Sequence, residues 1–434
     1  MRSPLLRRQF ELLGGARDFR RLFFAAFASG LGTMLAVIAL IVDVFDRTGS
    51  NTWVAALLIA DFLPMLVIGL LLGPLVDRFS RRRLMLVSDV VRFGVFVGLL
   101  VAPNALTVVV LAGILGFASG FFRPAVYAAL PNLVRDRDLP QGNALFQAAE
   151  NLMWLAGPLA GGVLLTIAGP TVPYAVCAVS FLVSAALILR IPAARFATAE
   201  PSGRGHWRDL AEGFRVVRGS RALVTVLVAW TVVMFANAGV NVAEVSLVKV
   251  SFEARDFHLG LMMAAAGSGL VLGSLTAGGW AERLPVAWLY GAAIALMAVG
   301  TGAAAASPTV WLAVAVVVVS GFGNGVAGVL NPLLVQRGAP DRVRGRAFTV
   351  IMSVNFAALG LGMIVAGRLT DLLGARWVWA LAAGIYAGAA VVAVLLARRV
   401  DVRQLLGDGS GERPDELVVV PTAAPQAVQA NEPG

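Results

Sequence analysis

Long uninterrupted apolar runs constrain this chain more than any other feature. Short polar gaps separate runs at 19–44, 52–76, 82–102, 105–129, 142–168, 171–191, 222–248, 258–282, 285–305, 308–332, 345–371 and 375–398. A hydrocarbon core about 30 Å thick requires ~20 apolar residues per helix. The runs are continuous rather than alternating, and they exceed the ~10 residues of a membrane barrel strand. We therefore predict an all-α membrane protein whose twelve helices cross the bilayer.

The chain is too apolar for an ordinary water-soluble protein. Hydrophobic residues make up 59% of it and charged residues 14%, whereas soluble domains have about 45–50% and about 25%. The net charge of +10 suggests nucleic acid, but the 34 Arg and the single Lys stand mostly in gaps between apolar runs, so we expect no nucleic-acid partner. The lone Cys177 excludes an intrachain disulfide and a thiolate metal cluster. We expect neither a metal site nor a cofactor.

The charges between the runs predict the orientation of the chain. With the N-terminus inside, the inner gaps contain Arg78, Arg81, Arg82, Arg83, Arg135, Arg137, Arg283, Arg337, Arg342, Arg344 and Arg346. The outer gaps contain little beyond Arg47, Lys249, Arg255 and Arg376. Cytoplasmic loops carry the excess of Lys and Arg, so we expect both termini in the cytoplasm.

An internal repeat divides the chain. A shift of 205 positions superposes Gly116–Gly120 on Gly321–Gly325 and the segment Gly73–Arg78 on Gly278–Arg283, and a shift of 201 superposes Asp43 on Glu244. The match of an acid followed by Arg at two helix ends is harder to obtain by chance than a match of glycines. We predict two pseudo-symmetric six-helix bundles, at 19–191 and 222–398.

Three segments lie outside the predicted bundles. Residues 1–18 form a cytoplasmic N-terminal segment, and residues 192–221 form a cytoplasmic central loop. In this loop Trp207, Leu210 and Phe214 share one helical face, which predicts an amphipathic helix at the membrane surface. Residues 399–434 are rich in Gly, Pro, Glu and Gln, and we expect a disordered cytoplasmic tail.

The connection between the second and third runs carries a motif. It reads Gly73-Pro74-Leu75-Val76-Asp77-Arg78-Phe79-Ser80-Arg81-Arg82. This resembles the signature of the major facilitator superfamily, which has Gly, three residues, Asp-Arg, two residues and a basic pair. Ser80 replaces the usual glycine. The predicted pair of six-helix halves agrees with the resemblance, because parallel repeats relate the two halves of such transporters.

Further segments resemble the drug–proton antiporter branch of that superfamily, which includes macrolide efflux pumps and siderophore exporters. These segments are Asp46–Ser50, Phe122–Ala125, Leu130–Val134 and Asn143–Leu145. Gly157-Pro158-Leu159-Ala160-Gly161-Gly162 resembles the antiporter motif of the branch, although Met153 occupies one expected glycine position. The resemblance covers nearly the whole membrane region.

The resemblance implies a secondary exporter that works by alternating access in the bacterial inner membrane. Its expected partners are the lipid bilayer, a small-molecule substrate and protons as the coupling ion, and we expect a monomer. No nucleotide-binding Walker sequence occurs, so ATP is not the direct energy source. A non-transporting membrane scaffold or sensor and a nutrient importer of the same fold stay open as alternatives.

The resemblance also implies a gate at the signature. Asp77 can face the positive N-terminal end of the eleventh span, which begins near Gly345, and such a contact must break when the cytoplasmic side opens. The gating candidates are Gly73, Asp77, Arg78, Arg81, Arg82 and, in the second half, Gly278, Glu282 and Arg283. An anchor that follows the positive-inside rule accounts for Arg81 to Arg83 equally well.

Ionisable side chains inside the runs are candidates for proton coupling, because they are costly to place in a bilayer. The candidates are Asp61, Asp43, Glu244 and Glu150. Structural alternatives stay open for each: Asp61 can pair with Arg92, Glu150 with Arg123, and interfacial water can solvate Asp43 and Glu244. Asp89 and Arg92 can pair with each other.

Polar groups and small residues inside the runs complete the list of candidates. Arg123, Asn151, Asn237 and Asn241 are candidates for the substrate cavity, with helix–helix hydrogen bonding as the alternative for Asn237 and Asn241. We assign Gly157, Pro158, Gly161 and Gly162 to close helix packing. A cavity of Ala, Val, Leu, Phe and Met with a few acids suits amphipathic molecules, cationic ones included. Siderophores or other secreted metabolites stay open as substrates.

Overall fold

Twelve long helices make up most of the described structure. The computed structural model describes residues 12–71, 79–135, 138–196, 214–339 and 341–397, and no strand occurs in these ranges. The signature residues Gly73, Asp77 and Arg78, most of the predicted amphipathic helix and the C-terminal tail lie outside them. The all-α prediction is confirmed within the described ranges.

The helices follow the apolar runs closely. The first half contains α2 (Arg17–Thr48), α3 (Asn51–Leu71), α5 (Arg81–Leu100), α6 (Ala105–Ala129), α7 (Leu139–Ala168) and α8 (Thr171–Leu189). The second half contains α10 (Arg221–Ser246), α11 (Asp256–Arg283), α12 (Val286–Ala306), α13 (Val310–Gly338), α14 (Asp341–Leu373) and α15 (Ala375–Ala397). One turn of π-helix, η4 (Leu247–Ser251), continues α10.

Local signals at the helix ends repeat between the halves. The side chain of Asn104 accepts a hydrogen bond from the backbone N–H of Thr107 and caps α6. Thr309, which stands 205 positions later, caps α13 in the same way. Gly169 after α7 and Gly374 after α14 are also 205 positions apart, and both have positive φ, where glycine avoids the strain of a side chain.

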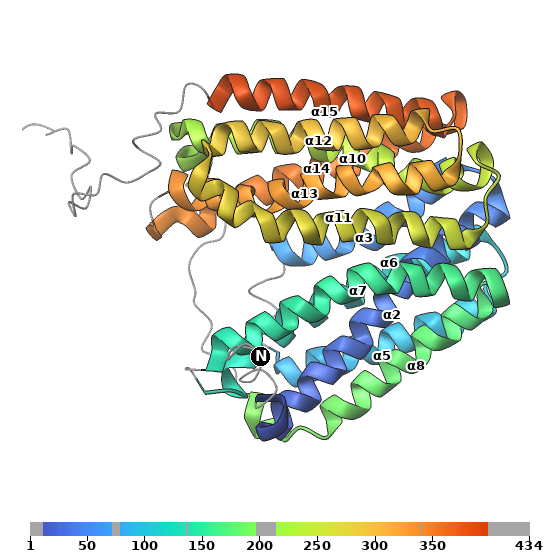
Figure 1. Ribbon diagram of the computed structural model, residues 1–434. Helices are drawn as coiled ribbons and strands as arrows, with labels where there is room; N and C mark the ends of the chain where they lie inside the picture. Colours follow the sequence, from blue (N-terminus) through green and yellow to red (C-terminus); the bar gives the residue numbers. More distant parts are fainter. Residues whose placement is uncertain (1–11, 72–78, 136–137, 197–213, 340, 398–434) are drawn as a thin grey trace, which may run out of the picture. The chain divides into compact units, whose positions relative to one another are not determined.

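Most helix contacts stay within one half of the chain. In the first half α2 packs on α7 and α8, α5 packs on α6 and α8, and α3 packs on α6. In the second half α10 packs on α14 and α15, α12 packs on α13 and α15, and α11 packs on α13. The two largest contacts between the halves are α3 with α14 and α7 with α11 (Figure 1), and smaller ones join α10 to α2 and α3 and α11 to α2. The domain boundaries given above stay predictions.

The helices are long and apolar enough for a membrane protein. Ten of the described helices meet both criteria for a membrane span. The other two long helices are α3, whose described side chains give a shorter apolar stretch from Asn51 to Pro64, and α5, which carries Asp89 and Arg92 in its middle. We call the end of the bundle where α2 ends and α3 begins the outer end, as the charge pattern predicts.

The charges of α5 are buried as a satisfied pair. Nη2 of Arg92 donates to Oδ1 of Asp89 at 2.6 Å, and the hydroxyl of Ser184 in α8 donates to the other carboxylate oxygen at 2.7 Å. The Arg92 guanidinium lies over the rings of Phe122 and Phe181, 4.4 and 4.5 Å from their centroids. The pair therefore ties α5 to α6 and α8.

This pair generates a stability prediction. Asp89→Ala leaves the buried Arg92 charge without its partner, and we expect a loss of about 3–5 kcal/mol. Replacing both residues, as Asp89→Ala with Arg92→Met, removes the orphaned charge and recovers part of that loss. Reversible unfolding of the purified protein in mixed micelles measures both. A double variant less stable than Asp89→Ala would contradict the account.

Candidate functional site

The basic residues after the signature bind helix ends within the first half. Arg81 donates from Nη1 to the carbonyl oxygen of Ala128 at 2.6 Å, and Arg82 donates from Nη2 to that of Leu189 at 2.7 Å. These carbonyls lie at the C-terminal ends of α6 and α8, where the helix dipole favours cations. Both arginines therefore hold the inner ends of these helices against the start of α5.

The equivalent segment of the second half ends α11. No atom lies within 4 Å of the position that a Cβ on Gly278 would occupy, so this glycine is not a close-packing position here. Arg283 is exposed in the last turn of the helix. The side chain of Glu282 lies outside the described part of the structure.

Asp43 is engaged within the first half near the outer end. One carboxylate oxygen accepts from Nε of Arg47 at 2.8 Å, and the other accepts from the Tyr174 hydroxyl at 2.9 Å. Asp43 is 5% exposed, so solvation by interfacial water, one of the alternatives above, is wrong for it. Arg47 also donates to the carbonyl oxygen of Ala102, and this network joins α2, α8 and the connection after α5.

Glu150, on the inner side, forms an ion pair and accepts a further hydrogen bond. The pair expected with Arg123 is present, with Nη2 of Arg123 2.8 Å from Oε2 of Glu150. The hydroxyl of Tyr127 donates to the other carboxylate oxygen at 3.0 Å. The Arg123 side chain is 70% exposed, so this pair presents a cation at the surface of the first half. Asn151 accepts from the side chain of Gln147 on the same helix.

Asp61 and Glu244 differ from these acids. Both are half-buried, and within the described residues neither carboxylate has an ion-pair or hydrogen-bond partner. The alternative pairing of Asp61 with Arg92 is wrong, because Arg92 binds Asp89 instead. Ionisable groups inside a membrane bundle are candidates for ion and substrate pathways.

Glu244 belongs to a polar stripe along α10. Asn237, Asn241 and Glu244 share one helix face and are all half-buried. Asn237 accepts a hydrogen bond from the hydroxyl of Tyr386 at 3.2 Å. The Asn241 side chain has no such partner among the described residues. The stripe therefore offers a carboxylate and one uncommitted amide to a ligand.

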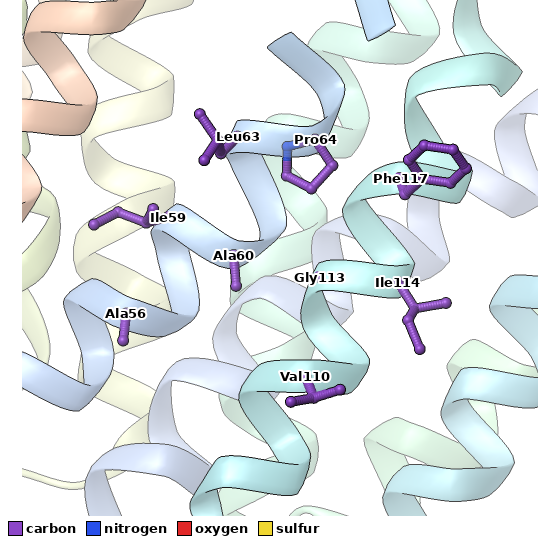
Figure 2. Close-up of a pocket in the computed structure, with 9 residues that line it drawn as sticks. All are labelled: Ala56, Ile59, Ala60, Leu63, Pro64, Val110, Gly113, Ile114 and Phe117. Atoms are coloured by element: carbon purple, nitrogen blue, oxygen red, sulfur yellow. The ribbon is translucent and has the colours of Figure 1, made fainter. Parts of the chain in front are cut away.

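An apolar pocket lies between α3 and α6, close to Asp61 in sequence. It has a volume of about 670 Å³, within the range of small-molecule sites. Pro64 and Phe117 stand near one end and Ala56 and Val110 near the other (Figure 2). The other lining residues are Ile59, Ala60, Leu63, Gly113 and Ile114. Such a lining can contact only the apolar part of a ligand.

The antiporter-like motif packs against both halves. A Cβ on Gly157 would overlap the side chain of Met34 in α2. A Cβ on Gly162 would lie 3.1 Å from Cα of Gly260 in α11. The packing around Gly161 is less tight, because a Cβ added there would lie 3.4 Å from the nearest atom, the carbonyl oxygen of Leu35. The carbonyl oxygen of Pro158 lies against Gly260 in α11, so closely that a Cβ added to Gly260 would overlap it.

The second contact between the halves is built the same way. A Cβ on Gly367 in α14 would lie 2.8 Å from Cβ of Ala55 in α3. Gly162 and Gly367 are 205 positions apart, as are Ala55 and Gly260. Farther along, the rings of Phe62 and Phe356 meet with centroids 5.0 Å apart. Small residues therefore let the halves approach at equivalent places.

The sequence did not predict the contacts of two polar residues at the outer end. Asp371 at the end of α14 binds the start of α3, and Lys249 in η4 pairs with Asp46 and Asp256. The internal repeat could have drawn attention to Asp371. It is equivalent to Thr166, and each of the two residues stands three positions before the glycine that ends its helix. His258, the one described histidine, packs on the ring of Trp311.

Comparisons with known proteins agree with the sequence motifs. The sequence profile of the transmembrane secretion effector family matches residues 15–417. The multidrug efflux pump Tap of Mycobacterium bovis is 28% identical over 378 residues, which cover 81% of this chain and 87% of that protein. Macrolide efflux protein A of Streptococcus pyogenes is 22% identical over 366 residues, which cover 80% and 87%.

Solved transporter structures share the fold. A bacterial homologue of the human lysosomal transporter Spinster superposes with a TM-score of 0.69 at 14% identity, and the match covers 92% of this chain and 98% of that one. The nucleoside transporter NupG superposes with a TM-score of 0.73 at 14% identity, over 87% and 99%. At these identities the likeness shows the fold alone.

The glycine contact between α7 and α11 generates a prediction. Gly260→Ala places a methyl group against the Pro158 carbonyl, and we expect a loss of stability of about 1–3 kcal/mol. Gly384→Ala in α15 is the matched control, because no atom lies within 4 Å of its Cβ position. The half-unfolding temperature in detergent checks both, and equal temperatures for the two variants would contradict the proposed tight contact.

Proposed function

The chain belongs to the transmembrane secretion effector family of major facilitator transporters, and on that premise we propose that it exports small amphipathic molecules by alternating access, in exchange for protons. Members of this family and the structural neighbours are transporters, not enzymes. Efflux is the activity in the names of the curated relatives, which match over four-fifths of this chain. The proposal extends that activity to this protein.

The two unpartnered carboxylates carry the proposal of proton coupling. Asp61 and Glu244 are half-buried and have no partner among the described residues. A carboxylate in such a place binds a proton when it is dehydrated and releases it when water or a cation reaches it. Asp43 and Glu150 serve this role less well, because each already accepts two hydrogen bonds.

The proposed substrate class rests on the presence of both apolar and polar candidate binding surfaces. We assign the apolar part of the substrate to linings such as the pocket between α3 and α6, and the polar or cationic part to the stripe of Asn237, Asn241 and Glu244 on α10. Arg123 and Asn151 offer polar groups on the inner side of the first half. Partly apolar lining with a few polar groups is the usual composition of small-molecule sites.

The inner gate belongs to the same proposal. Asp77 and Arg78 follow α3 in sequence, and the resemblance to the family assigns Asp77 to the start of α14. The positive-inside pattern supports an inner-membrane protein with both termini in the cytoplasm. We propose that a single chain is the transporting unit, since each half contains a candidate carboxylate, Asp61 in the first and Glu244 in the second.

Export by carboxylate variants tests the proposal. In cells loaded with a fluorescent cationic dye, expression of the protein is expected to increase dye efflux, and a protonophore is expected to abolish the increase. Asp61→Asn and Glu244→Gln each remove an ionisable group without changing its size, and we expect at least a tenfold loss of efflux from one or both.

Glu253→Gln is the matched control for these variants. Glu253 is exposed on the connection between α10 and α11, so its replacement removes one charge outside the helices. Equal expression of all variants is checked in the isolated membranes. Efflux that resists the protonophore, or that is unchanged in the Asp61 and Glu244 variants, would refute proton coupling through these residues.

A further inference from the structure

The carboxylate of Asp371 joins the two halves of the protein at the outer end. It lies in the last turn of α14 and accepts from the backbone N–H groups of Asn51 and Thr52, at 2.6 and 3.0 Å. It also accepts from three side chains at the start of α3, those of Ser50, Asn51 and Thr52, at 2.8, 3.0 and 2.7 Å. One side chain of the second half therefore receives five hydrogen bonds from the first.

The contact is a helix cap supplied from another helix. The first N–H groups of a helix have no partner within it, and the helix dipole makes its N-terminus attractive to an anion. A cap normally comes from the residue just before the helix. In α3 the hydroxyl of Ser50 does accept from the backbone N–H of Thr52, at 3.2 Å, but Asp371, some 320 residues away, accepts from the same N–H and from that of Asn51. This second part of the cap is present only while α3 and α14 lie together.

The repeat carries an equivalent contact between the other two interface helices. The backbone N–H of Phe257 in the first turn of α11 donates to the hydroxyl of Thr166 in α7 at 2.9 Å. Thr166 and Asp371 are 205 positions apart, and so are Thr52 and Phe257. Each half thus caps a helix of the other half at an equivalent place, with a hydroxyl in one case and a carboxylate in the other.

A third contact at the same end is ionic. Lys249, the one lysine of the chain, forms ion pairs with Asp46 at the end of α2 and with Asp256 at the start of α11. Asp46 belongs to the first half, and Lys249 and Asp256 belong to the second. The ion pair therefore also spans the interface, although Asp46 is half exposed and an exposed pair contributes little.

We propose that Asp371 is the latch of the outer gate, which holds the outer ends of α3 and α14 together and must release the start of α3 before the protein opens outward. Thr166 is the weaker latch at the equivalent contact. This inference rests on the proposed alternating access.

A distance measurement across the outer end tests the latch. Pro103 and Pro308 are exposed, lie in equivalent connections of the two halves and are not part of the latch. Spin labels at Pro103→Cys and Pro308→Cys, with Cys177→Ala as the background, report the separation of the halves by pulsed electron paramagnetic resonance in lipid nanodiscs. No substrate is needed, so a failed export assay and a failed latch are distinguishable.

The expected result is a shift of population. Asp371→Asn keeps the size of the side chain but removes its charge and replaces one acceptor oxygen by an NH₂ group that faces donors. We expect the ratio of short to long distances to fall about two- to thirtyfold. Thr52→Val removes one of the five hydrogen bonds, and we expect about a two- to tenfold fall.

Glu253→Gln serves as the control, because it removes an outer charge without touching the latch. A ratio in Asp371→Asn equal to that in Glu253→Gln would overturn the proposal. If Asp371→Asn does not fold, an unchanged ratio in Thr52→Val overturns it, and the expected fall supports it.

Discussion

The cost of placing a charge in an apolar environment organises this protein. An ionised side chain inside a bundle requires a partner, because burial removes the water that would otherwise stabilise it. Asp89 and Arg92 meet this requirement with a hydroxyl and two aromatic rings, and Asp43 meets it with Arg47 and Tyr174. Both networks tie helices of the first half together. Asp61 and Glu244 stand out because the described structure gives them no such partner.

The interface between the halves is built differently from their interiors. The second half contains a large apolar cluster with residues such as Trp230, Tyr290 and Tyr386, whereas the cluster between α3, α10 and α14 is small and rich in alanine. Glycines at equivalent places let backbones touch, and polar caps close the outer end. A further large cluster contains buried residues of both halves, among them Ile38, Phe181, Leu247 and Trp379, so apolar contacts also join the halves.

Much of the fold was predictable from the sequence, because hydropathy and span length decide where membrane helices lie. Local pairs were predictable too, since Asp89 and Arg92 are three residues apart on one helix. The cap on α3 was not, because Asp371 and Thr52 meet only after the halves assemble. The alternative that pairs Asp61 with Arg92 was wrong. Arg92 could bind either Asp61 or Asp89, and the choice depends on which face of α5 turns inward.

In the proposed mechanism, proton movement and substrate export are one coupled process. Purified protein in liposomes that contain a pH-sensitive dye isolates this coupling, because no other transporter is present. With an acidic lumen and a cationic substrate added outside, we expect the substrate to accelerate the rise of lumenal pH, and we expect this acceleration to be lost when Asp61 and Glu244 are both neutralised. Substrate uptake with no change in the rate of proton release would contradict it.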